Sequence, residues 1–436
     1  MTHDADSLLR PSRPDGPVDH LPRLLPATFA AEPASLDEHV ARHGLVPSCG
    51  RDQRRREELI GVVGRAGLTG RGGASFPTAR KLAAVASGHR RPVVIANGTE
   101  GEPASAKDKV LLARQPHLVL DGAVLAAEMI GASRAVVVVH HAVREIVDNA
   151  AAERRRAGID KVRIRVMTAA DQFVAGEASA VVHWVERGVA KPTKTPPHVS
   201  EHGLEGRPTL VQNVETLAHI ALIARHGASW FRSVGTPAEP GSMLVTLTGA
   251  LRRPGVYEIE IGTPVSQILG LAGGPSAPLS ALLVGGYFGT WVNWDSAGAL
   301  PFSAAGLGTL GAGPGAGLVA ALSDDSCGLT ETAHVTRYLA SQSAGQCGPC
   351  LFGLNSIAGQ MEALAGGRTD DPGKLLRWLG QVDGRGACRH PDGLVRMVRS
   401  AVECFGVEID QHALGQCCGT GATSMLPVPP QARRWR

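Results

Sequence analysis

The feature that most constrains the fold is an alternation of short apolar runs with helical patterns between residues 57 and 230. The apolar runs are four to seven residues long, whereas the segments between them carry apolar residues at helical spacing. Strands separated by helices of this length predict a parallel sheet covered by helices. We expect strands at 92–97, 135–139 and 161–167, and helices at 117–130 and 144–157. Gly131 directly follows the first of these helices and suits a C-cap.

The pattern changes twice along the remaining chain. A β-rich module is predicted, with strands at 243–248, 256–261 and 282–284, a helix at 265–271 and a glycine-rich loop at 303–316. Helical patterns then recur at 330–340, 350–364, 374–379 and 393–405, and a short one lies near 35–44. The 436 residues fit two to four domains. We expect a Pro-rich, partly disordered leader (1–55), an α/β domain (56–238), an α+β module (239–302), a linker (303–327), a helical bundle (328–418) and a flexible tail (419–436).

Charge and hydropathy exclude some functions. The net charge is +4, and no long Lys/Arg run interleaves with aromatic residues, so no nucleic-acid partner is expected. No apolar stretch reaches about 18 residues, and the N-terminus lacks the pattern of a secretory signal. We therefore expect a cytoplasmic protein without direct membrane insertion. All of the 8 cysteines except Cys49 follow residue 320, which indicates metal or redox chemistry.

A glycine-rich segment at 67–78 contains Gly67, Gly70, Gly72 and Gly73 and ends in a proline that suits the first turn of a helix. Backbone amides converging at a helix N-terminus form an anion site, and Arg71 and Lys81 add positive charge. A ligand with a phosphate group is the physical expectation. A plain surface loop is the alternative, since the pattern is neither the dinucleotide fingerprint nor a P-loop.

Polar segments also follow the predicted strands. They lie at 97–103, 176–178 and 212–216, where side chains at the carboxyl end of a parallel sheet commonly line a ligand crevice. Each could alternatively be a capped turn.

Cys347 and Cys350 are separated by two residues, and Cys388 follows. Three interpretations are open: a thioredoxin-like dithiol, which needs a strand directly before it, a structural zinc site with His390 close by, or an iron–sulfur cluster.

As a set, and in this order, these segments resemble the NADH-oxidising flavoprotein subunit of respiratory complex I and the related diaphorase subunits of soluble hydrogenases and formate dehydrogenases. The resemblance runs from about residue 57 to about residue 415. It implies an α/β fold class with a Rossmann-like flavin domain, a ubiquitin-like soluble-ligand-binding module and a C-terminal helical bundle with an iron–sulfur site. The chain is a divergent member by its motifs.

The resemblance also implies cofactors and site residues. FMN would contact Gly70, Arg71, Gly72, Gly73, Lys81, Asn97, Glu100, Gly176, Glu177, Gln212 and Asn213. Glu102 matches a residue near the nicotinamide, and Phe76 one of the aromatic residues that sandwich the dinucleotide. Metal ligands would be Cys347, Cys350 and Cys388. No catalytic acid or base is expected, because hydride transfer to the flavin requires none.

This chain departs from the family pattern at the dinucleotide and cluster sites. Thr99 replaces an aspartate, Ala178 replaces a glutamate, and Ala84 and His198 stand where the family has aromatic residues. Losing aromatic stacking removes about 1 kcal/mol or more per ring. Ala344 occupies the first position of the family's Cys-x-x-Cys-x-x-Cys.

A 4Fe-4S cluster, which the resemblance favours, would need a fourth ligand from Ser341, Ser343, Cys327 or solvent. A 3Fe-4S cluster would need none, and a third alternative is that the cluster has been lost.

The implied function is an oxidoreductase of the NADH dehydrogenase type that passes electrons from NADH through FMN to an iron–sulfur cluster and on to a partner protein. A ferredoxin or another carrier could replace NADH, and a non-catalytic assembly subunit is a different class of hypothesis. Any association with a membrane would come through partner proteins.

Overall fold

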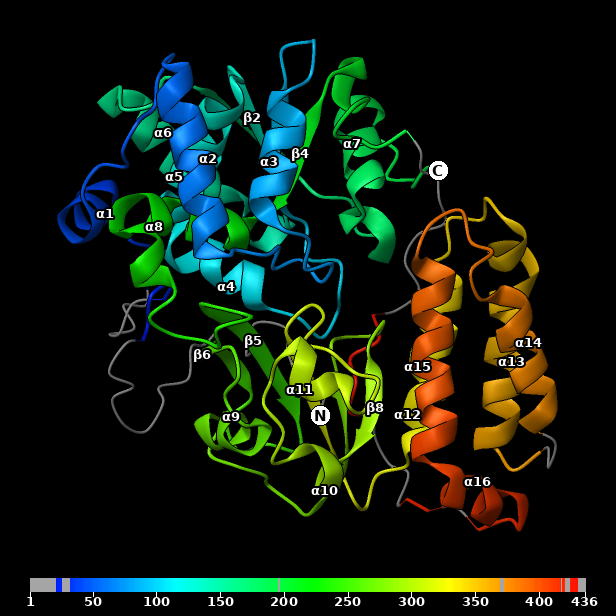
Figure 1. Cartoon of the computed structure of the whole chain (residues 1–436). Helices are drawn as coiled ribbons and strands as arrows, with labels where there is room; N and C mark the ends of the chain where they lie inside the picture. Colours follow the sequence, from blue (N-terminus) through cyan, green and yellow to red (C-terminus); the bar gives the residue numbers. More distant parts are fainter. Residues whose placement is uncertain are drawn as a thin grey trace.

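A computed structural model of the chain describes residues 21–25, 32–194, 197–368, 372–416, 418–419 and 424–429. Figure 1 shows three parts: an α/β domain at the top, a β-rich module beneath it and a helical bundle beside both. The mixed α/β fold class predicted from the sequence is confirmed, with its parallel Rossmann-like sheet and its C-terminal helical bundle.

The α/β domain is built on a four-stranded parallel sheet of order β3-β2-β1-β4. In register, Ile95 of the central strand lies between Val136 and Val211. All three predicted strands are present. The apolar runs of β1 and β2 are buried on both faces, as covered parallel strands require, whereas the edge strand β3 is mostly partly exposed. The strands are β1 (Val93–Gly98), β2 (Arg134–Val139), β3 (Arg163–Thr168) and β4 (Thr209–Asn213).

Helices cover this sheet, and the most buried is α5, in which every residue is buried. It ends at Gly131 in the left-handed conformation, as predicted. A Cβ at Gly122 would lie 1.9 Å from the Leu217 carbonyl oxygen, so only glycine allows α5 to approach α8 this closely. The helices are α1 (Leu36–His43), α2 (Gln53–Ala66), α3 (Thr78–Ala86), α4 (Lys107–Arg114), α5 (Pro116–Ile130), α6 (Arg144–Ala157), α7 (Ala178–Arg187) and α8 (Val214–Phe231), with short turns η1 (His141–Val143), η2 (Phe173–Gly176) and η3 (Leu204–Gly206).

The β-rich module is a five-stranded mixed sheet of order β6-β5-β9-β7-β8. Two predictions are wrong here. The expected linker at 303–327 supplies β9, the central strand, which pairs parallel with β5 and antiparallel with β7. The expected loop at 303–316 contains α11, which the Ser303 hydroxyl caps by accepting from Gly306 N at 3.0 Å. The elements are β5 (Ser242–Gly249), β6 (Gly255–Glu260), α9 (Val265–Leu271), β7 (Leu279–Val284), β8 (Thr290–Asn293), α10 (Trp294–Ala297), α11 (Ala304–Gly308) and β9 (Leu318–Ser323).

The C-terminal bundle has the predicted helices, with one difference at its start. The helix expected from residue 350 begins as a π-helical turn, η4, and becomes α-helical only at Leu354. Such turns inside helices are frequent at functional sites. The elements are α12 (Gly328–Ser341), η4 (Pro349–Gly353), α13 (Leu354–Ala365), α14 (Pro372–Val382), α15 (His390–Cys404) and α16 (Gly406–Ala413).

The described parts of the leader and the tail are packed against the body of the protein. Leu24 is 1% exposed, and the Glu258 carboxylate accepts from the backbone N–H groups of residues 23, 24 and 25. At the other end, Glu331 accepts from Met425 N at 2.8 Å and Leu426 N at 3.0 Å. The prediction of a loose tail is therefore wrong for 424–429, whereas 1–20, 26–31, 420–423 and 430–436 lie outside the described residues.

No single helix among the described residues has the length and hydropathy to cross a membrane. Taken together, α4 and α5 meet that criterion, but they are bent by 97° and α5 is wholly buried.

Candidate functional site

The glycine-rich loop is closed on itself and lies against the carboxyl end of β4. Gly70 N donates to Phe76 O at 2.9 Å, which holds the loop as a compact turn before α3. Gly73 has φ +99, and a Cβ on Gly72 would lie 3.2 Å from Asn213 Cβ. No side chain caps α3, so the loop and the helix start present backbone amides to one region.

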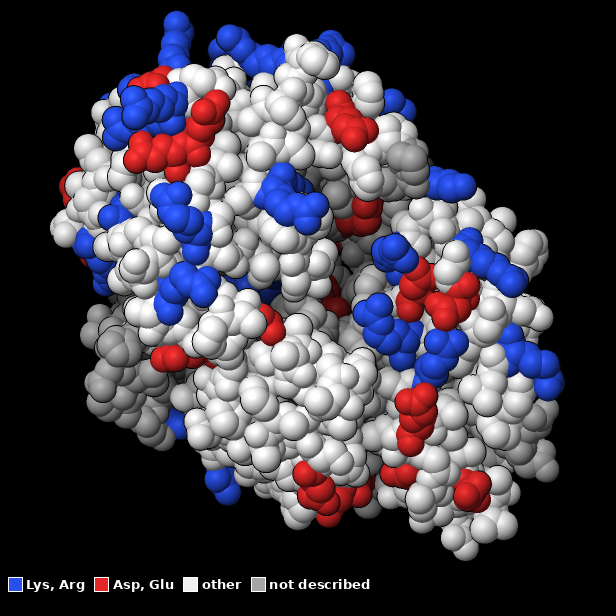
Figure 2. Space-filling model, viewed as in Figure 1, with Lys and Arg blue, Asp and Glu red and all other residues white. Residues whose placement is uncertain are grey.

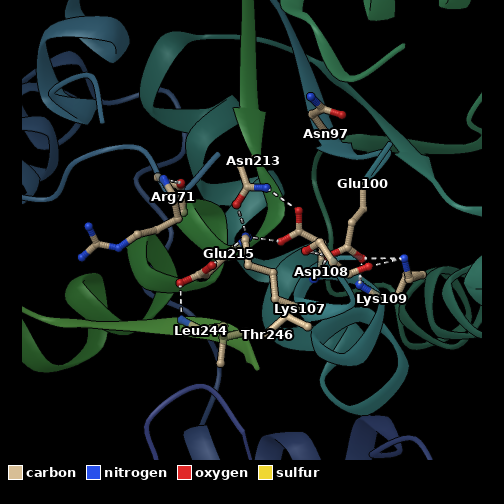
Figure 3. Close-up of polar contacts among 12 residues, drawn as sticks. Arg71, Asn97, Glu100, Lys107, Asp108, Lys109, Asn213, Glu215, Leu244 and Thr246 are labelled. Carbon is tan, nitrogen blue, oxygen red and sulfur yellow. Dashed lines mark hydrogen bonds and ion pairs between the residues drawn. The ribbon is translucent and has the colours of Figure 1, made fainter. Parts of the chain in front are cut away.

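The two basic residues of this segment take different positions. The Arg71 guanidinium is buried and donates to Thr69 Oγ1 at 3.0 Å and Pro240 O at 3.4 Å. Figure 3 shows its side chain pointing away from Asn213. Its backbone N–H instead donates to Thr216 Oγ1 at 2.8 Å. Lys81 Nζ donates to Val211 O at 2.5 Å, and burial lowers the pKa of Lys81 to about 8.

At the carboxyl end of β1, Asn97 and Glu100 are committed to protein contacts. Asn97 Nδ2 donates to Gly176 O at 2.9 Å, which joins two of the predicted segments. Glu100 has φ +44, unusual for a residue with a side chain, and accepts from Ser105 Oγ at 2.7 Å and Lys109 N at 2.9 Å. Glu100 therefore fastens the start of α4 rather than presenting a free carboxylate.

Glu102 reaches across to the β-rich module. Its Oε2 accepts from Tyr287 N at 2.9 Å, whereas its buried Oε1 has no partner among the described residues. Burial raises the pKa of Glu102 to about 8, and the negative charge of Glu100 adds to this. Burial therefore favours the protonated form of this carboxyl group more than it would be favoured in an exposed glutamate.

A buried ionic network that the sequence pattern did not predict supports the site (Figure 3). Lys107 Nζ lies 2.7 Å from Asp108 Oδ1 and 2.8 Å from Glu215 Oε2, and Asn213 Nδ2 donates to Asp108 Oδ2 at 2.6 Å. Glu215 Oε1 accepts from Leu244 N at 2.9 Å, which ties the α/β domain to β5. The polar residues after β4 are the only sequence signal for this network, because its members at 107–108 and 213–215 are distant in the chain.

Three buried polar atoms near the strand ends are without a partner among the described residues. They are Thr99 Oγ1, Glu102 Oε1 and Gln212 Oε1, from the ends of β1 and β4. Buried polar groups are normally hydrogen-bonded, so unpartnered atoms gathered at one sheet edge fit a polar ligand. A separate cavity of about 430 Å³ is lined by Leu21 and residues 235–271 and by none of the predicted site residues.

The three cysteines gather where η4 meets the start of α15. Burial raises the pKa of Cys350 to about 12, and the neighbouring thiols of Cys347 and Cys388 add to this. Burial also raises the pKa of Cys388, with contributions from Glu177 and Cys347. Thiols that raise one another's pKa do so because their thiolate forms would repel each other at short range. A bound metal centre would offset this repulsion by its positive charge.

The strand-end segment at 176–178 is linked to the bundle that carries the cysteines. Glu177 influences the pKa of Cys388, and the neighbouring Gly176 accepts from Asn97. Phe173 N also donates to Gln342 Oε1 at 3.0 Å, which fixes η2 to the bundle. Figure 2 shows a hollow where the three parts meet, with acidic side chains inside it.

The structure removes several alternatives at the cysteines. No strand precedes Cys347, because α12 and a turn do, so the thioredoxin-like interpretation is wrong. Cys327 lies at the opposite end of α12, whose 14 residues span about 21 Å, and cannot be the fourth ligand. The hydroxyl of Ser341 donates to Tyr338 O at 2.6 Å, and that of Ser343 to Cys350 O at 3.5 Å.

Comparison with known proteins agrees with this arrangement. Three family models match: the Nuo51 FMN-binding domain over residues 63–222, the SLBB domain over 244–286, and the NADH-ubiquinone oxidoreductase-F iron-sulfur binding region over 330–412.

The F subunit of the NADH-quinone oxidoreductase of Streptomyces coelicolor is 30% identical over 83% of this chain and 84% of its own length. The corresponding protein of Escherichia coli is 29% identical over 81% and 84%. An NAD+-reducing NiFe hydrogenase in its H2-reduced state superposes with a TM-score of 0.76 at 30% identity.

The hydrogenase match covers 82% of this chain but 62% of the hydrogenase chain, so this chain spans less than two thirds of that relative. The match to the Streptomyces protein, by contrast, extends over most of both sequences. The resemblance inferred from the sequence is thereby confirmed: the chain belongs to the family of NADH-quinone oxidoreductase F subunits, with the FMN-binding, SLBB and 4Fe-4S regions in the same order.

Proposed function

We propose that this chain is an NADH-dependent oxidoreductase subunit that takes electrons from NADH through FMN to an iron–sulfur cluster and passes them to a partner subunit. The observation that carries the proposal is the contiguity of the two candidate sites. Asn97 Nδ2 donates to Gly176 O at 2.9 Å, and Phe173, three residues earlier in η2, donates its N–H to Gln342 Oε1 of the cysteine-bearing bundle at 3.0 Å. A ligand at the strand ends would therefore lie next to the cysteine group.

The residues present at the strand ends fit FMN. The backbone amides of Gly72 and Gly73 and the start of α3, which no side chain caps, would hold its phosphate, with Lys81 nearby. The unpartnered oxygens of Thr99 and Gln212 would receive polar groups of the ligand. Arg71 supports the loop from behind rather than contacting the ligand.

The cysteines fit a cluster better than a single ion. A zinc ion with Zn–S distances of about 2.3 Å would hold its thiolates about 3.8 Å apart. The sulfur atoms of Cys347, Cys350 and Cys388 do not all lie within 4.8 Å of one another, as they would around one ion. The Ser341 hydroxyl donates to Tyr338 O at 2.6 Å, so Ser343 or solvent would be the fourth ligand of a 4Fe-4S cluster, and a 3Fe-4S cluster would need none.

When bound, FMN accepts a hydride and releases single electrons, which the cluster receives one at a time. The protein positions these groups and excludes water. The Oε1 of Glu102 has no partner among the described residues and would be available to a nicotinamide amide, and burial favours the protonated form of this carboxyl group. Phe76, at 49% exposed, offers one ring for stacking, whereas Ala84 and His198 offer less surface than the aromatic residues of the family pattern.

The partner would receive electrons at the π-helical turn. Leu351 and Phe352 follow Cys350 directly and are 54% and 70% exposed. Large exposed apolar side chains beside a redox centre favour a docking protein. The relatives are named as parts of larger enzymes, and we infer an electron-transfer subunit as the partner here, with a ferredoxin as the alternative.

The test is anaerobic purification followed by flavin, iron and sulfide analysis, and then stopped-flow mixing with NADH. We expect one FMN, three or four irons, and bleaching of the flavin band by NADH. Cys388→Ala should lose the iron and keep the bleaching. Absence of bleaching at saturating NADH in FMN-loaded protein would leave a ferredoxin or another carrier as the donor, and protein without FMN and iron would indicate an assembly subunit.

A further inference from the structure

A second group of metal-binding side chains lies at the far end of the bundle from Cys347, Cys350 and Cys388. Cys327 precedes α12, His412 belongs to α16, and Cys418 follows that helix. Their ligand atoms all lie within 4.8 Å of one another, and no other such group of three occurs among the described residues. Because Cys327 is 85 positions away from His412 in the chain, the fold alone brings them together.

The distances match the edges of a zinc tetrahedron. His412 Nε2 lies 3.5 Å from Cys327 Sγ and 3.4 Å from Cys418 Sγ. Bond lengths of about 2.3 Å to sulfur and 2.05 Å to nitrogen at tetrahedral angles place these atoms about 3.6 Å apart. Both nitrogen–sulfur distances therefore suit one shared ion, and the two sulfur atoms lie within 4.8 Å of each other.

The surroundings orient the ligands. His412 Nδ1 donates to Ala365 O at 2.8 Å, which leaves the lone pair on Nε2, the nitrogen that faces both sulfurs and accepts a long hydrogen bond from Cys418 N at 3.5 Å. A backbone carbonyl bound to the other ring nitrogen is typical of a metal-ligating histidine. Thr330 N donates to Cys327 Sγ at 3.4 Å, which fixes the position of this sulfur at the start of α12.

Two glycines allow the backbone to close around this group. A Cβ on Gly419 would lie 2.7 Å from Cys327 N, and a Cβ on Gly367 would lie 2.4 Å from His412 O. Any other residue at 419 would push the segment carrying Cys418 away from Cys327. His412 and Cys327 are themselves buried, at 3% and 5% exposed.

We propose that Cys327, His412 and Cys418 bind one zinc ion, which fastens the segment after α16 to the start of α12. Binding would release the two thiol protons and give a Cys2His site whose fourth position is filled by water or another group. Two thiolates and an imidazole suit zinc better than calcium or magnesium, which prefer oxygen. The site is independent of the electron-transfer function proposed above.

The experiment measures zinc in the anaerobically purified full-length protein by elemental mass spectrometry and reads its ligands by zinc K-edge X-ray absorption. We expect about one zinc per chain, with two sulfur scatterers near 2.3 Å and nitrogen near 2.0 Å. His412→Ala and Cys418→Ser should each lose the zinc and keep the iron. Cys404→Ser is the matched control, since this bundle cysteine lies outside the group and should leave both metals unchanged.

Other results would overturn the proposal. Zinc that survives in His412→Ala but disappears in Cys388→Ser would belong to the other cysteine group. A disulfide between Cys327 and Cys418 in anaerobically prepared protein, found by peptide mass mapping, would replace the ion by a covalent link. Protein that contains no zinc and takes up none on dialysis against a tenfold excess would also refute it.

Discussion

Replacing Lys107 by methionine tests how much this buried ammonium group contributes to the stability of the α/β domain. Lys107 is 2% exposed and lies 2.7 Å from Asp108 and 2.8 Å from Glu215, whose side chains are 7% and 0% exposed. Burial lowers the pKa of Lys107, but the two carboxylates more than offset this and raise it. Removing the ammonium would leave two carboxylates facing each other without a cation.

Breaking a buried ion pair from one side costs about 3–5 kcal/mol. For a domain of 150–250 residues, each kcal/mol lowers the melting temperature by about 2–4 °C. We therefore expect Lys107→Met to melt roughly 10 °C below the parent protein at pH 8. Differential scanning fluorimetry of both proteins measures this directly.

The deficit should shrink on acidification. Burial already raises the pKa of Asp108 to about 6, while Lys107 holds it down. Without Lys107 the folded-state pKa rises further above the unfolded value, so the folded variant binds a proton that the unfolded chain does not. Its loss of stability is then fully present above the raised folded-state pKa and declines as the pH falls towards the unfolded value.

Two further variants complete the test. Arg144→Met removes one partner of the Arg144–Asp148 pair, whose side chains are 35% and 44% exposed, and should shift the melting temperature by less than about 2 °C. Lys107→Met combined with Glu215→Gln should recover part of the loss, because the amide oxygen can still accept from Leu244 N. A deficit of about 2 °C or less for Lys107→Met, or one that is the same at pH 5 and pH 8, would refute the reasoning.

Three other predictions concern the proposed sites. Cys350→Ala should lose iron yet keep FMN in elemental and flavin analysis, and simultaneous loss of both would contradict separate sites. Gly72→Ala places a Cβ 3.2 Å from Asn213 Cβ and should weaken FMN binding about tenfold in a fluorescence titration, about 1.4 kcal/mol; an unchanged Kd would place FMN elsewhere. Glu102→Gln should gain stability relative to the parent as pH rises from 5 to 8, by up to about 4 kcal/mol in flavin-free protein, because the parent's pKa of about 8 lies above the unfolded value. A pH-independent difference in melting temperature would contradict that assignment.

The sequence predicted elements whose signals are local. The helix at 144–157 and the helix at 265–271 have the predicted bounds, because capping glycine or apolar spacing marks both ends. The sequence predicts a linker at 303–327, whereas the structure has β9 at 318–323. A six-residue apolar run among glycines does not reveal which strands it pairs with. Those partners, β5 and β7, are set by tertiary packing.

The candidate sites divide in the same way. The spacing of the glycines in the loop and the pair Cys347 and Cys350 can be recognised from the sequence alone. That the Arg71 side chain turns inwards, and that Lys107 meets Glu215, depends on which surfaces the fold buries. Cys327, His412 and Cys418 show no ligand spacing along the chain, so only the folded arrangement reveals them as a group.

Glu331 has a practical consequence for anyone who shortens or tags this protein. Its side chain receives two backbone N–H groups and the hydroxyl of Ser424, all from 424–426, and its residue is only 4% exposed. Deleting those residues would leave a desolvated carboxylate without donors against the bundle core, a loss of several kcal/mol. An affinity tag that replaces the chain immediately after residue 419 would therefore remove these contacts, and a shortened chain should be judged by its melting temperature before its activity is interpreted.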